Sequence, residues 1–279
     1  MAYGSSKKSA HTASVGISAY DLPTQDKIPV IEKLMPSDYR GLALDIGSGT
    51  GYTTYLVFGD RPTVCVDLYA PNLQYHRNRI ASLSLARQPL CIVARATALP
   101  FKPGVFRVIL CSEVLEHLED DDAAAKELAW VLASDGRAVV TVPHSKWGFA
   151  SFLELCRIKT VHDFPGPERH FRVGYTKESL ARVLRRHGLQ IEESCYYLRF
   201  FTRIATDLVS LGHLLFQKIV HRRNVWNWSD VTKLEDNLVF RIYTRIFPML
   251  WVFSRLDRLF LWAPGFGLVA AIKKSQTEK

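Results

Sequence analysis

Short apolar runs alternate with longer amphipathic segments along most of the chain, and this pattern predicts its elements. The runs are too short for buried helices and are bounded by Gly, Pro or charged residues, so we expect them to be strands. The expected strands span residues 42–46, 63–67, 90–93, 105–111, 136–144, 189–195 and 266–274. Segments with apolar residues at helical spacing lie between them. The expected helices span residues 21–34, 71–85, 120–132 and 176–187, with one more directly after residue 52.

The first predicted strand leads directly into a glycine-rich turn. Asp45 lies near its end, and Gly47, Ser48, Gly49 and Gly51 follow at once. Glycine reaches backbone angles closed to other residues and lets the main chain approach a ligand without a Cβ in the way. We therefore expect this turn to cradle a ligand.

Two other interpretations of the turn are open. A nicotinamide-dinucleotide site has the pattern G-x-G-x-x-G, in which the third glycine seats the helix against the strand. Tyr52 occupies that third position, which disfavours a pyrophosphate site. The remaining interpretation is a glycine turn that binds no ligand.

The second predicted strand also ends in an acid, Asp67, which follows Asp45 by the length of a complete strand, helix and strand unit. A carboxylate at this position can accept hydrogen bonds from both hydroxyls of a ribose. We therefore assign Asp67 to the ribose of a nucleoside.

Three segments together resemble one known family. They are the glycine turn from Asp45 to Gly51, the segment Leu99-Pro100-Phe101, and the segment Ser112-Glu113-Val114-Leu115-Glu116-His117-Leu118. This combination is similar to the class I S-adenosylmethionine-dependent methyltransferases, in the type 11 group related to the ubiquinone and menaquinone C-methyltransferases. The resemblance covers about residues 20–195 and the last strand.

The resemblance implies a Rossmann-like α/β fold. Its seven-stranded sheet is mostly parallel with an antiparallel last strand, and S-adenosyl-L-methionine is the cofactor. The residues that the resemblance assigns to cofactor binding are Asp45, Gly47, Ser48, Gly49, Gly51, Asp67, Leu68, Ala96, Thr97, Leu99 and Ser112.

The chain departs from the family at Arg95, where an acid usually binds the adenine amino group. Arginine cannot accept a hydrogen bond, so adenine recognition is expected to fall to backbone groups near Ala96 and Thr97. Arg107 replaces a second acid before the fourth strand, and we expect that change to be neutral for chemistry.

The candidates for general acid–base catalysis are Glu113, His117 and His144, which follow the fourth and fifth strands. The carboxyl ends of these strands adjoin the departing methyl group in the fold, and histidine titrates near neutral pH. Alternatively, Glu116 and His117 only orient the loop. His170 and Arg172 either bind an anionic or phenolic oxygen or tie their loop to the sheet.

In the parent fold the sixth and seventh strands form a nearly direct hairpin, so residues 198–264 are an insertion here. Apolar residues at helical spacing predict two helices, over residues 200–219 and 231–256. From residue 199 onward the chain holds 13 Lys and Arg against 6 Asp and Glu, which is most of its net charge of +9. Basic helices with apolar faces and tryptophans are typical of a membrane-surface anchor. A cap folded onto the sheet or a dimer interface are the alternatives, and nucleic-acid binding is disfavoured by the long aliphatic stripes.

The five cysteines include no pair at C-x-x-C spacing, so we expect no metal site, no disulfide framework and a reducing compartment. The first 20 residues lack the apolar core of a secretory signal, and we interpret residues 1–14 as a mobile tail. No apolar run is long enough to span a bilayer. We expect a cytoplasmic protein, with the inner face of the membrane as a candidate docking surface.

The predicted domains are a methyltransferase core at residues 15–197, the helical insertion at 198–264, and a last strand and tail at 265–279. The predicted function is methyl transfer to a lipophilic or membrane-presented small molecule, such as a quinone precursor, an isoprenoid or a lipid-linked sugar. One alternative is a soluble small-molecule or glycan acceptor, with the insertion as a lid. The other is a non-catalytic binding protein, suggested by Arg95.

Overall fold

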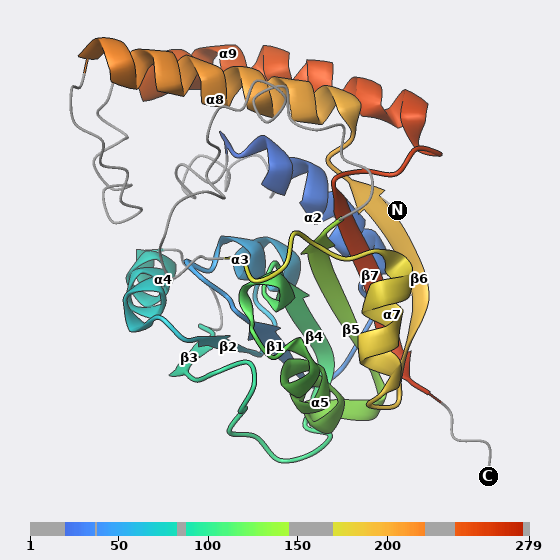
Figure 1. The fold of residues 1–279 in the computed structure, drawn as a ribbon. Helices are drawn as coiled ribbons and strands as arrows, with labels where there is room; N and C mark the ends of the chain where they lie inside the picture. Colours follow the sequence, from blue (N-terminus) through green and yellow to red (C-terminus); the bar gives the residue numbers. More distant parts are fainter. Residues whose placement is uncertain (1–19, 37, 83–87, 145–169, 221–237, 276–279) are drawn as a thin grey trace.

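The computed structural model describes residues 20–36, 38–82, 88–144, 170–220 and 238–275. Its centre is a seven-stranded sheet in the order β3-β2-β1-β4-β5-β7-β6 (Figure 1). The strands are β1 Leu42–Ile46, β2 Thr63–Asp67, β3 Leu90–Val93, β4 Phe106–Ser112, β5 Leu132–Pro143, β6 Leu189–Tyr197 and β7 Gly267–Lys274. β7 runs antiparallel to both of its neighbours, while the pairs among β1 to β5 are parallel. The predicted fold class is confirmed.

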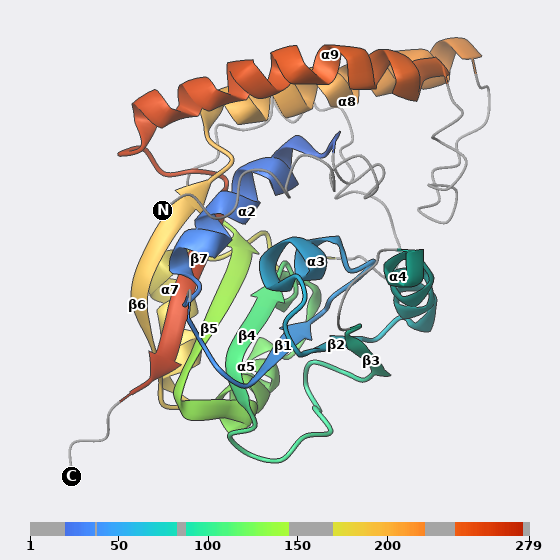
Figure 2. The same cartoon turned by 180° about the vertical axis from the view of Figure 1, so that it is seen from behind.

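Helices cover both faces of the sheet (Figures 1 and 2). They are α2 Leu22–Leu34, α3 Tyr52–Phe58, α4 Ala70–Ser82, α5 Asp121–Val131, α7 Lys177–Arg185, α8 Phe200–Val220 and α9 Leu238–Ser254, with 3-10 turns η2 Leu115–His117 and η5 Arg255–Phe260. Side chains alternate between the faces along each strand. Leu44 and Ile46 of β1 therefore join the core under α5 and α7, and Ala43 joins the core under α2 and α3.

Local signals in the sequence explain where the helices begin. Asp120 caps α5 by accepting a hydrogen bond from the Ala123 N–H at 2.9 Å. Thr176 and Ser179 form a reciprocal capping box at the start of α7. The predicted helix over residues 176–187 ends earlier than expected, at Arg185, and β5 begins at Leu132 rather than at residue 136. The predicted tail at residues 1–14 lies outside the described residues.

The segment between β6 and β7 forms a separate outer layer. α8 and α9 lie side by side in opposite directions, and α2 lies between them and the sheet (Figures 1 and 2). α8 contacts α2, α9 and η5. The helical insertion before the last strand is therefore present, although α9 begins at Leu238 and residues 221–237 are not described.

A buried carboxylate connects the two ends of this layer. Asp257 of η5 is only 4% exposed, and its two oxygens accept hydrogen bonds from the N–H groups of Phe201 and Thr202 at 2.7 and 3.0 Å. These donors belong to the first turn of α8, where backbone N–H groups lack partners within the helix. Asp257 thus caps α8 from a segment about 55 residues further along the chain.

We predict that Asp257→Ala lowers the free energy of unfolding by about 1–2 kcal/mol, because both N–H groups lose their acceptor. Urea unfolding followed by circular dichroism measures this change. Asp38→Ala, at an exposed position, is the control and should stay within about 0.5 kcal/mol of the parent. Equal stabilities of the two variants would contradict the capping role.

Candidate cofactor and acceptor site

The carboxyl ends of the parallel strands β1, β2, β4 and β5 meet at one edge of the sheet. This edge carries the glycine turn, Asp67, the segment from Ser112 to His117, and His144. Ligands in open α/β sheets bind at such an edge. The topology therefore gathers the main sequence-predicted site segments in one region.

The glycine turn is held against β2 by its backbone. The N–H groups of Gly47 and Ser48 both donate to the Val66 carbonyl, at 2.7 and 3.0 Å. Gly51 has a φ of 80°, and a Cβ there would lie 2.1 Å from the His76 ring, so only glycine fits. Gly49 differs, because a Cβ at its position would have no atom within 4 Å. The turn is therefore tightly packed at Gly51 and open at Gly49.

Asp67 joins the loops that follow β1 and β2. Its Oδ2 accepts the N–H of Gly49 and its Oδ1 accepts the N–H of Tyr69, both at 2.8 Å. An ionised carboxylate has about four acceptor positions, so each oxygen can still accept a hydroxyl. Leu68 and Tyr69 beside it are 61% and 55% exposed. An open backbone, a fixed carboxylate and adjacent exposed apolar side chains fit a nucleoside.

Asp45 is turned away from this open region. It is 1% exposed, and its Oδ2 accepts the hydroxyl of Thr54 on α3. Burial raises the pKa of Asp45 to about 7, against the lowering effect of the Thr54 hydrogen bond. This hydrogen bond connects β1 to α3. A contact between Asp45 and the cofactor stays a prediction.

The residues expected to contact the adenine lie partly at the surface and partly in the core. Ala96 and Thr97 are half-buried at the surface, and the Arg95 side chain is exposed. Leu99 instead packs in the core, and its N–H donates to the Glu127 carboxylate at 2.8 Å. Because its side chain and its N–H are both engaged, the predicted contact of Leu99 with the cofactor could use only the remaining backbone atoms.

A hydrogen-bond network surrounds Glu113 at the end of β4. Its Oε1 accepts the hydroxyls of Thr141 at 2.6 Å and Tyr197 at 2.8 Å, and Thr141 also lies 3.0 Å from the Ser112 hydroxyl. Glu113 has a φ of 56°, which is strained for a residue other than glycine. The network holds this strained carboxylate in one orientation.

Sequence reasoning missed Thr141 and Tyr197. Thr141 had a signal, because it is the one hydroxyl within the apolar run of β5 from Ala138 to Val142. Tyr197 had none, since it lies past the predicted end of the sixth strand and 84 residues from Glu113.

Glu116 is a buried acid beside two histidines. It is 0% exposed, and its carboxyl oxygens make no hydrogen bond within the described part of the chain. Burial, and then the nearby Glu113 charge, raise the pKa of Glu116 to about 9, so it is protonated at neutral pH. Its Oε1 lies 3.9 Å from the Nε2 of His117. The His117 and His170 rings pack edge to face, with their centroids 4.4 Å apart.

Arg172 ties its loop to the segment after β4. The guanidinium donates to the Leu118 carbonyl, to the Glu119 carbonyl at 2.9 Å and to the Asp121 carboxylate at 2.9 Å. Tyr175 donates to the same carboxylate at 2.7 Å. Of the two roles considered for Arg172, the structure therefore supports the one that fixes the loop.

His144 follows β5 and is 7% exposed. Its backbone N–H donates to the Phe266 carbonyl at 2.6 Å, and its ring packs against Tyr196 with centroids 4.9 Å apart. Residues 145–169, which follow it, lie outside the described residues. A role for His144 at the acceptor stays a prediction.

We predict that Glu116→Gln reduces the loss of stability with rising pH. Glu116 stays protonated in the folded protein up to about 9, while the unfolded chain ionises above 4.5. The unfolded state therefore binds fewer protons in this range, and the free energy of unfolding falls by up to about 1.4 kcal/mol per pH unit.

Urea unfolding between about pH 5 and 8 tests this, and the glutamine variant should show a slope shallower by up to that amount. Glu119→Gln at an exposed site is the control and should keep the parent slope. Parallel curves for parent and Glu116→Gln would show that Glu116 ionises normally in the folded state.

Part of this chain is similar to known methyltransferases. Residues 44–140 match the methyltransferase domain family. A malonyl-[acyl-carrier protein] O-methyltransferase of Halorhodospira halophila is 34% identical over 96 residues, which are 33% of this chain and 32% of that protein. Its namesake from Geobacter sulfurreducens is 29% identical over 157 residues, or 54% and 56% of the two chains. The matches thus span about a third and just over half of these relatives.

A solved structure with the same fold is phosphoethanolamine N-methyltransferase 2 of Haemonchus contortus, in complex with S-adenosyl-L-methionine. It superposes with a TM-score of 0.55 at 16% identity, over 89% of this chain and 52% of that one. The segment that matches the methyltransferase domain family, residues 44–140, runs from β1 into β5 and therefore includes the glycine turn, Asp67 and the segment from Ser112 to His117.

Proposed function

We propose that this protein transfers a methyl group from S-adenosylmethionine to a lipophilic small molecule presented at a membrane surface. The observation that supports methyl transfer is the Asp67 carboxylate, fixed beside the open backbone of Gly49. The observation that supports a lipophilic acceptor is the exposed apolar and basic face of α9.

Different residues at the sheet edge bind different parts of the cofactor in this proposal. Asp67 accepts the two ribose hydroxyls, and the Gly49 backbone allows close approach. Backbone groups at Ala96 and Thr97 take the adenine. When bound, the cofactor supplies a sulfonium methyl that is already activated for transfer. The protein then chiefly aligns the acceptor and excludes water.

Glu113 is the proposed base when the acceptor must lose a proton. Its Oε1 accepts the hydroxyls of Thr141 and Tyr197. These bonds orient the carboxylate and leave Oε2 to receive the proton. Glu116, held neutral by burial, adds no second negative charge beside it.

The outer face of α9 and η5 carries an exposed apolar stripe at helical spacing. We call it the α9 stripe; it consists of Ile242, Ile246, Met249, Val252, Leu256 and Leu259. Exposed Trp251 and Trp262 lie near it, and Arg241, Arg245 and Arg258 are exposed on the same segment. The only acid from residue 238 to 262 is the buried Asp257.

This combination matches the energetics of an interfacial anchor. Apolar burial contributes about 25 cal/mol per Å², and each basic residue near an anionic surface adds about 1 kcal/mol. No helix in the described ranges is long and apolar enough to cross a bilayer. The proposed attachment is therefore peripheral, at the inner face of the membrane.

A second candidate acceptor comes from the names of the two curated relatives. Both are named for a malonyl group carried by acyl-carrier protein. In that case the basic face would meet a carrier protein rather than a membrane. A soluble small molecule or glycan, with α8 and α9 as a lid, is the remaining acceptor class.

We predict that Asp67→Ala raises the Kd for S-adenosylmethionine about 10- to 100-fold, because two charge-assisted hydrogen bonds are lost. Isothermal titration calorimetry measures the Kd, with Asp38→Ala as the control that should bind like the parent. Failure of the parent to bind would favour a non-catalytic protein of the same fold. Unchanged binding by Asp67→Ala would contradict the ribose assignment.

We predict that the parent sediments with phosphatidylglycerol vesicles at low salt, and that Met249→Glu/Val252→Glu binds at least about 10-fold more weakly, because two exposed apolar contacts are lost. Val173→Glu alters an 85% exposed valine outside the insertion and should bind like the parent. A parent protein that stays in the supernatant would rule out the membrane-presented acceptor. The calorimetric result is independent of this outcome.

A further inference from the structure

A cluster of two cysteines and a histidine lies away from the acceptor side of the sheet. Cys65 is on β2, Cys91 is on β3, and these residues are direct partners in the parallel register. His76 comes from α4, which packs against both strands. Side chains of partnered residues point to the same face of a sheet, so the two sulfurs lie together under the histidine.

The distances within the cluster are close to those of a metal site. The Cys91 Sγ lies 4.0 Å from the His76 Nδ1, and the ligand atoms of all three residues are within 4.8 Å of one another. Tetrahedral Zn²⁺ with Zn–S of about 2.3 Å and Zn–N of about 2.0–2.1 Å keeps its ligands roughly 3.5–3.8 Å apart. A disulfide requires sulfurs about 2.05 Å apart, which is closer than the spacing of two sulfur ligands around Zn²⁺.

The cluster is enclosed by the fold. Cys65 and His76 are 0% and 1% exposed, and Nδ1 is the His76 ring nitrogen that faces the Cys91 sulfur. Thiolate sulfur and imidazole nitrogen are the ligands that Zn²⁺ prefers.

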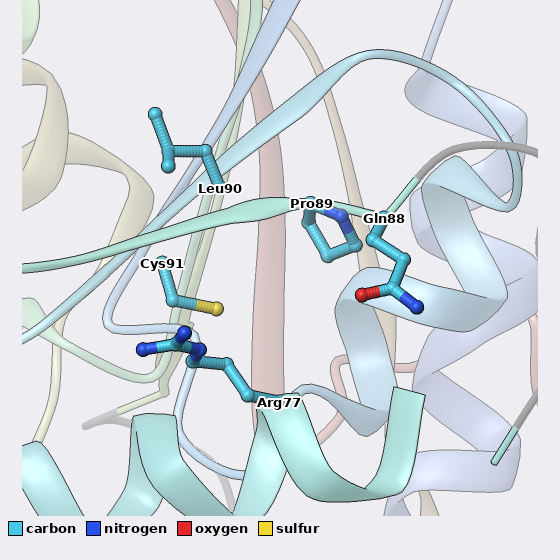
Figure 3. A pocket seen from close by; sticks show the side chains of 5 residues that line it. All are labelled: Arg77, Gln88, Pro89, Leu90 and Cys91. Carbon is cyan, nitrogen blue, oxygen red and sulfur yellow. The ribbon is translucent and has the colours of Figure 1, made fainter. Parts of the chain in front are cut away.

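An opening reaches the cluster from the surface. A pocket of about 220 Å³ is lined by Arg77, Gln88, Pro89, Leu90 and Cys91. Figure 3 shows the Cys91 sulfur beside the Arg77 guanidinium at this pocket. The pocket offers a path for an ion and room for a water molecule as a fourth ligand, as three-ligand zinc sites require.

We propose that Cys65, His76 and Cys91 bind a thiophilic divalent cation, with Zn²⁺ as the best match to two sulfurs and one nitrogen. The ion joins β2, β3 and α4 on the side where His76 packs against Gly51. It thereby fixes the ring that supports the glycine turn. The C-x-x-C criterion could not find this site, because its ligands come from three separate elements.

The test uses the full chain, stripped with a chelator and titrated with Co²⁺ and then Zn²⁺. We expect one equivalent of Co²⁺ to give a sulfur-to-cobalt charge-transfer band and the visible bands of a tetrahedral site, and Zn²⁺ to displace it. Cys91→Ser and His76→Asn should each weaken Zn²⁺ binding by at least about 100-fold, since even the loss of an outer contact costs 10- to 100-fold.

Cys111→Ser on β4, and Cys156→Ser outside the described residues, are the controls and should bind like the parent. Circular dichroism confirms that each variant is folded, and Cys91 is the mildest change because it is partly exposed. Absence of saturable binding, a cobalt spectrum without the sulfur band, or equal binding by folded Cys91→Ser would each overturn the proposal. A spectrum without sulfur would indicate the second group, Glu116, His117 and His170.

Discussion

The Asp67 carboxylate is the contact on which the geometry of the site depends. It accepts one N–H from the glycine turn after β1 and one from the loop after β2. The two loops are thus joined through one carboxylate at the end of a buried strand. The same anion keeps acceptor positions for a ligand, so the interaction that orders the loops also prepares the site.

The remainder of the site is organised by two acids in different environments. Glu113 accepts two hydroxyl hydrogen bonds, whereas Glu116 is enclosed without such partners and is held neutral by burial. The two neighbouring carboxyl groups therefore differ in their hydrogen bonding and in their burial. The strained backbone at Glu113 is stabilised by Thr141 and Tyr197, which come from the fifth and sixth strands.

Features set by local sequence could be predicted. The apolar runs identified all seven strands, including the last one beyond the insertion, and the glycine turn and Asp67 were located from their spacing. Contacts between distant segments could not be predicted. Nothing local shows that Asp257 caps α8, that Arg172 fastens its loop to Leu118, or that Cys65 and Cys91 are register partners. Leu99 illustrates the same limit, since a matching motif did not reveal that its side chain belongs to the core.

Helix α2 connects the outer helices to the edge of the sheet that carries the site. Gln25 of α2 donates to the Tyr52 hydroxyl beside the glycine turn at 2.7 Å, and Asp26 accepts the Leu198 N–H at the start of the insertion at 2.6 Å. The most direct measurement is a crystal structure with S-adenosylhomocysteine. We expect both ribose hydroxyls to lie on the Asp67 carboxylate and the nucleoside to lie against Gly49. A nucleoside bound elsewhere, with Asp67 contacting only its two backbone N–H groups, would contradict it.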